Sequence, residues 1–124
     1  MVPKTSSKMN NERRKTLKEV LTDLQQFVDG KVPEAEALEA LNGPSADLFN
    51  CLFDEKESRD NLMEVIPSGP KVDKAIKCVY ELEDAYDDIQ AVKQHLQDND
   101  AEYKGSVEVY IKSAIEHIKK SMEK

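Results

Sequence analysis

Apolar residues recur at helical spacing through the longest uninterrupted stretch of this sequence. The intervals between them are four, three, three, four, three and seven residues, and the positions are Val72, Ile76, Val79, Leu82, Tyr86, Ile89 and Leu96. This is the period of one face of an α-helix. It predicts a helix over residues 71–97, about 39 Å long at 1.5 Å per residue.

Three further segments show the same period. The segment 10–29 carries a stripe from Leu17 to Val28, has an asparagine at its start to cap it, and is followed by Gly30, a residue type that commonly ends helices. The segment 101–122, with Asp100 as its cap, carries an apolar face from Tyr103 to Met122. The segment 45–65 contains Leu48, Phe49, Leu52 and Phe53, the densest apolar group in the chain, which we expect to be core.

Proline and glycine mark the predicted breaks. Pro67-Ser68-Gly69-Pro70 predicts a turn before the longest helix, because two prolines and a glycine interrupt a helical hydrogen-bond ladder. Gly43-Pro44 predicts the end of a short connecting helix over 33–41, after which Ser45 caps the next helix. The charged run after Phe53 leaves an alternative open, a break near Asp54 or Ser58, but one helix to Val65 is the preferred interpretation.

These elements predict an all-α fold. We expect one domain over residues 9–124, an antiparallel helical bundle of four main helices plus the short connecting helix, because 124 residues supply apolar material for a single core. Residues 1–8 are polar and lack periodicity, so they are expected to form a flexible basic tail, or in part an expression remnant. No run reaches the roughly 18 to 20 apolar residues that a transmembrane helix needs, and the start of the chain lacks the apolar stretch of a secretory signal. These two features favour an intracellular protein, cytoplasmic or nuclear.

Charge is distributed unevenly around a net value of −7. Residues 1–20 carry six Lys or Arg against Glu12 and Glu19, whereas residues 21–70 carry eleven acids against Lys31, Lys56 and Arg59. An acidic body disfavours binding to nucleic-acid phosphates. The basic start of the chain could contact a membrane or nucleic acid, although no aromatic residue interleaves it for base stacking.

Chemistry-bearing motifs are scarce. Cys51 and Cys78 lack CxxC or CxxH spacing, and we expect buried thiols there; His95 and His117 sit near helix C-termini, where imidazolium complements the dipole. No phosphate-binding glycine loop or nucleophile elbow is present. The sequence therefore predicts no enzyme, no catalytic or metal-binding residues, no cofactor and no small-molecule substrate.

A docking face on the longest helix is the remaining functional hypothesis. Acids share its polar side. Tyr80 and Val92 on this helix, and Tyr110 on the last helix, lie off the main stripes. The candidate partner-binding residues are Tyr80, Glu81, Asp84, Asp88, Val92 and Tyr110. The alternatives are a solvated acidic surface and a broad stripe buried within the bundle.

The expected function is that of a protein–protein interaction module, an adaptor or a subunit of a larger assembly, whose partner is another protein. Two rivals remain at this stage. One is an acidic inhibitor that mimics nucleic acid, and the other is a structural protein that self-associates into a homo-oligomer through a coiled-coil seam along residues 72–89.

Overall fold

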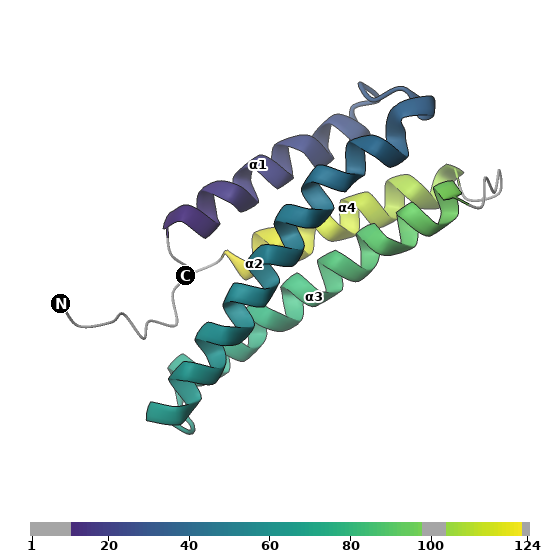
Figure 1. Cartoon of the computed structure of the whole chain (residues 1–124). Coiled ribbons are helices and arrows are strands. Elements are labelled where there is room, and N and C mark those ends of the chain that lie inside the picture. The colour runs from purple at the N-terminus through teal and green to yellow at the C-terminus, as the bar shows by residue number, and fades with distance from the viewer. Residues whose placement is uncertain (1–10, 98–103, 123–124) are drawn as a thin grey trace.

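The computed structural model describes residues 11–97 and 104–122, which form four long helices (Figure 1). They are α1 (Asn11–Val28), α2 (Ala37–Val65), α3 (Pro70–Gln97) and α4 (Lys104–Ser121), and a short 3-10 turn, η1 (Glu34–Glu36), leads into α2. These ranges contain no strand. The predicted all-α class with four main helices is confirmed, while the tail over 1–8 and the Asp100 cap lie outside the described residues.

The four helices form an antiparallel bundle. The helix α1 packs against α2 and α4, and α3 packs against the same two neighbours. Consecutive helices run in opposite directions, and α2 and α3 extend beyond the N-terminal end of α1 (Figure 1). The short turn over Pro67–Gly69 makes α2 and α3 antiparallel neighbours, as the sequence predicts.

One apolar core passes through all four helices. Its largest fully buried members are Leu17, Val20, Leu24, Leu41, Leu48, Val79, Leu82, Ile89, Val92, Ile111 and Ile118. Each such side chain contributes roughly 1.5 to 3 kcal/mol by leaving water. A smaller cluster of Leu62, Val72 and Ala75, with Ile76 against it, holds together the projecting ends of α2 and α3.

Two glycines with positive φ lie next to helix ends, Gly30 after α1 as the sequence predicts and Gly69 in the predicted turn before α3. Gly30 follows α1 with a φ of 72°, and its N–H donates to the carbonyl of Phe27 at 3.1 Å. Gly69 has a φ of 128° directly before Pro70, the first residue of α3. Both backbone conformations are costly for residues with a Cβ, which explains glycine at these ends.

The predicted end of a helix at Gly43-Pro44 is wrong. The helix α2 runs from Ala37 to Val65 without interruption, with Pro44 inside it, so no separate connecting helix occupies 33–41. Proline in a helix interior lacks one hydrogen bond and crowds the preceding turn, at a cost of about 3 kcal/mol. Leu41 and Leu48 are fully buried on either side of the buried Pro44, so packing of this face outweighs the local penalty.

Ser45 has a different role from the predicted cap. It lies inside α2 and is buried, and its Oγ accepts a hydrogen bond of 2.8 Å from Nε2 of Gln90 on α3. The alternative break near Asp54 or Ser58 does not occur either, because α2 continues through both residues. The preferred prediction of one helix up to Val65 is confirmed.

No helix within the described ranges is long and apolar enough to cross a membrane.

Candidate functional site

The predicted docking acids on α3 divide between two environments. Glu81 faces α4, where one of its carboxylate oxygens lies 2.6 Å from Nδ1 of His117. Asp84, one turn further on, is exposed to solvent. The structure therefore leaves Asp84 available to a partner, whereas Glu81 is already engaged in packing between α3 and α4.

Asp88 also faces α4. Burial raises the pKa of its carboxyl group, while a hydrogen bond with Ser113 and the nearby His117 act in the opposite direction. Within the described part of the chain, its Oδ2 is buried and accepts no hydrogen bond. A carboxylate of this kind is costly to keep ionised, because it has given up water without full compensation.

The other predicted docking residues are likewise not all on one surface. Val92 is fully buried in the core, so the expectation that it lies off the buried stripe is wrong. The ring of Tyr110 is half-buried and lies against His95, with ring centroids 5.9 Å apart. Tyr80 is 61% exposed on the outer side of α3. Of the six predicted residues, Tyr80 and Asp84 are thus the two that project into solvent.

An aromatic surface that the sequence did not predict lies on α2. Phe49 and Phe53 are 47% and 60% exposed, so the expectation that both are core is wrong. They are four residues apart and so share one side of the helix. The ring of Phe49 lies against Tyr86 of α3, with centroids 5.5 Å apart. We call Phe49, Phe53 and Tyr86 the aromatic face.

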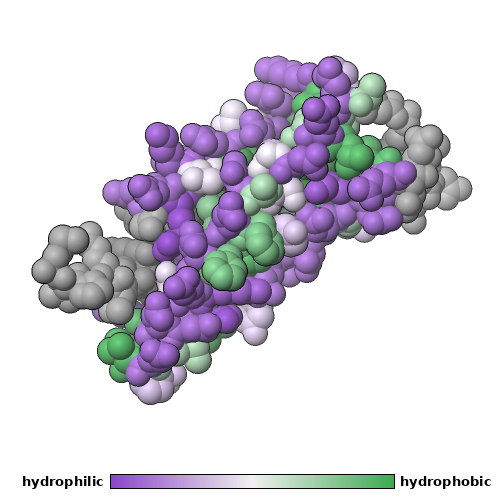
Figure 2. Space-filling view, viewed as in Figure 1, coloured by the Kyte–Doolittle hydropathy of each residue, from purple (hydrophilic) through white to green (hydrophobic). Residues whose placement is uncertain are grey.

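Figure 2 shows apolar side chains in the middle of the molecule, over α2, within a predominantly hydrophilic surface. Phe49 and Phe53 are the large exposed hydrophobic residues of this part of α2. A shallow hollow of about 310 Å³ adjoins Phe49, and it is lined by Asn42, Ser45, Ala46, Phe49, Asn50, Tyr86 and Lys93. Large aromatic side chains left in water beside a hollow are typical of surfaces that bind another molecule.

Acidic residues border the aromatic face. Glu57 lies one turn beyond Phe53 on α2, and Glu83 and Asp87 flank Tyr86 in the sequence of α3. In the part of the chain that the structure describes, these three carboxylates form no ion pair. The lysines of this region are Lys56, next to Glu57, and Lys93, at the hollow.

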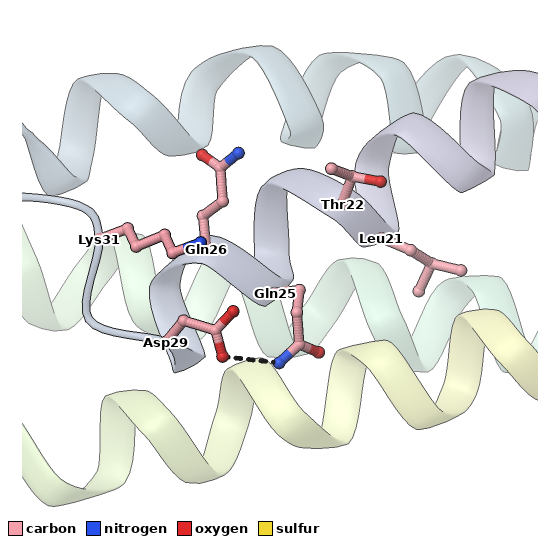
Figure 3. Close-up of a pocket in the computed structure, with 6 residues that line it drawn as sticks. All are labelled: Leu21, Thr22, Gln25, Gln26, Asp29 and Lys31. Carbon is pink, nitrogen blue, oxygen red and sulfur yellow. Dashed lines mark hydrogen bonds between the residues drawn. The ribbon is translucent and has the colours of Figure 1, made fainter.

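A second hollow lies on the outer side of α1 near its C-terminal end (Figure 3). Its volume is about 370 Å³, and its lining consists of Leu21, Thr22, Gln25, Gln26, Asp29 and Lys31. The side-chain amide of Gln25 donates to Asp29 at 3.1 Å. Its polar groups are those of an ordinary helix surface, and they do not converge on a point where a ligand could be held.

The two cysteines are buried, as the sequence predicts. Burial, reinforced by nearby carboxylates, raises the pKa of the Cys51 thiol to about 11 and that of Cys78 to about 12. Thiolate, the reactive form, is therefore rare at neutral pH, so neither residue is suited to nucleophilic chemistry. No group of three or more His, Cys, Asp or Glu suited to a metal ion occurs among the described residues.

Comparisons with known proteins identify no relative of this chain. No protein-family model, no curated protein and no solved structure matches it.

Proposed function

We propose that this chain is a non-enzymatic protein–protein interaction module, an adaptor or a subunit of a larger assembly, which docks through the aromatic face of α2 and α3. The observation that carries the proposal is the exposure of two phenylalanines one helical turn apart, 47% for Phe49 and 60% for Phe53. The partner is another protein, and an intracellular location belongs to the same proposal.

The energetics favour a partner over bare solvent for this surface. Burying a phenylalanine fully is worth roughly 1.5 to 3 kcal/mol, and both rings retain about half of their surface for that purpose. Phe49 is held against Tyr86 in the unbound molecule, so less conformational entropy is lost when the ring is covered. Aromatic residues presented in this way commonly dominate the binding energy of protein interfaces.

The projecting end of the α2–α3 hairpin supplies a matched control for this proposal. Met63 and Val65 are 39% and 67% exposed there, and they are two apolar residues on the same helix as Phe49 and Phe53. Changing either pair to serine removes comparable exposed apolar surface while the core remains intact.

The test is affinity capture from a native lysate at low and high salt with three proteins: wild type, the double variant F49S/F53S and the control M63S/V65S. We expect the wild type and the control to capture the same protein, and F49S/F53S to lose it. Equal capture by all three proteins, or loss in the control alone, would contradict the aromatic face as the docking surface.

The two rival functions give different results in the same experiment. Capture of nucleic-acid-handling proteins that is lost at high salt would favour the acidic mimic. A solution mass above the 14.1 kDa of one chain, with no captured protein, would favour self-association.

A further inference from the structure

We propose that the occupant of the aromatic face is a basic amphipathic helix of another protein, which lies along the groove between α2 and α3 and places its apolar side on Phe49 and Phe53. This inference rests on the proposed docking function and deepens it by naming the chemistry of the partner.

The relative position of α2 and α3 provides the groove. Two contacts fix their antiparallel register, the hydrogen bond from Gln90 to Ser45 and the ring contact between Phe49 and Tyr86. Phe49 and Phe53 lie roughly 5 to 6 Å apart at their Cβ atoms, because that is the spacing of residues four apart on a helix. The side chains of a third helix repeat at the same interval, so its apolar ridge can pack along these two rings.

The charges along the groove select a basic partner. The register places Glu83 at the level of Phe53 and Asp87 at the level of Phe49, and Glu57 lies one turn further along α2. Glu83 and Asp87 are four residues apart, so they repel each other across one turn of α3. Neither forms an ion pair within the described residues, and a Lys or Arg from a partner would relieve this repulsion.

Asp54 and Asp84 are exposed but lie away from the groove. Asp54 lines a hollow with Glu12 and Arg13 of α1, and Asp84 follows Glu81 by one turn on the side of α3 toward α4. Along the groove the three carboxylates of Glu57, Glu83 and Asp87 outnumber the two lysines, Lys56 and Lys93. The excess of carboxylates disfavours a second copy of this chain on the same face, because a symmetric contact would bring these acids together with their own copies. It also disfavours an anionic nucleic acid or lipid surface.

The probe for this proposal is a fluorescent 18-residue helical peptide with leucine at positions i, i+3, i+4 and i+7 and lysine on its other side. A peptide of the same pattern with glutamate in place of lysine is its counterpart. Binding is measured by fluorescence anisotropy at 50 and 300 mM NaCl to the wild type, F49S/F53S, E83K/D87K and E19K/D23K. The last variant makes the same charge change at two exposed acids four residues apart on α1.

We expect the lysine peptide to bind the wild type, to bind F49S/F53S and E83K/D87K at least tenfold more weakly, and to bind E19K/D23K with unchanged affinity. The glutamate peptide should not bind the wild type. Circular dichroism of each variant confirms that the four-helix fold is retained.

Three results would overturn the inference, and they differ in what they say about the docking function. If E83K/D87K binds the lysine peptide as the wild type does while F49S/F53S does not, the aromatic face binds proteins but not through basic residues. If E19K/D23K loses as much affinity as E83K/D87K, the lysine peptide is attracted by the net negative charge of the protein and not by the acids along the groove. If F49S/F53S keeps full affinity, the aromatic face is not the docking surface, and the proposed function falls with the inference.

Discussion

Arg13 of α1 and Glu55 of α2 form an ion pair in which Nε of the guanidinium lies 2.6 Å from Oε1 of the carboxylate. Only 15% of the arginine side chain and 5% of the glutamate side chain remain exposed. The guanidinium also reaches the hydroxyl of Ser58 at 3.5 Å. This pair ties the first turns of α1 to the middle of α2, close to both buried cysteines.

Replacing Glu55 by Gln should destabilise the protein by roughly 3 kcal/mol, the lower end of the range for breaking a buried ion pair from one side. The guanidinium of Arg13 would lose the negative charge of Glu55 while most of the arginine side chain stays out of water, since only 15% of it is exposed. Urea denaturation at pH 7 measures the change. The matched control is D60N, which breaks the exposed Arg59–Asp60 pair of α2 and should change the unfolding free energy by less than about 1 kcal/mol. Equal losses in the two variants would contradict the stabilising role assigned to burial of the Arg13–Glu55 pair.

Asp88 should make the stability of the protein depend on pH in an unusual direction for a carboxylate. Burial raises the pKa of this group above its ordinary value of 3.8, so the folded state binds its proton more readily than the unfolded state does. The free energy of unfolding therefore falls as the pH rises from the ordinary pKa of the group through its raised pKa in the folded state. Above the raised pKa, the destabilisation by ionised Asp88 is fully present.

The variant D88N removes this cost while keeping an oxygen that can accept from Ser113. We expect D88N to be more stable than the wild type at pH 7, and the difference to shrink as the pH is lowered toward 4. Urea denaturation across this range measures it, with D84N at the neighbouring exposed acid as the control for loss of one negative charge. The prediction fails if D88N is less stable than the wild type at pH 7, or if the two variants give the same pH profile.

Much of the fold could be predicted because the relevant signals are local. The apolar period of α3 and the prolines and glycine between Pro67 and Pro70 give that helix and its start within a residue. The predicted helix end at Pro44 is wrong because the local cost of the proline is outweighed by burial of Leu41 and Leu48. That gain depends on tertiary packing, which the local sequence does not contain.

The candidate site is harder to predict, because two adjacent apolar residues point in different directions from a helix and the sequence does not show which of them is buried. Leu48-Phe49 and Leu52-Phe53 are two such pairs; the leucines are buried and the phenylalanines are exposed. The paired spacing shows that the stripe is broad, but which member faces inward depends on the rotation of α2 against α3. The contact between Glu81 and His117 depends in the same way on the register of two helices.

The two cysteines should resist alkylation in the folded protein. With the pKa of Cys51 raised to about 11, about one thiol in a thousand is ionised at pH 8, and the fraction is smaller for Cys78, whose pKa is about 12. Both thiols are also buried, so iodoacetamide can react with them only when the bundle opens.

Mass spectrometry at pH 8 should show slow labelling of native protein and fast labelling of both residues in urea. A cysteine introduced by S68C in the exposed turn before α3 supplies the internal standard and should react fast in the native state. Labelling of Cys51 or Cys78 at the rate of that standard without urea would contradict the prediction, because it would show that the helices do not bury these thiols.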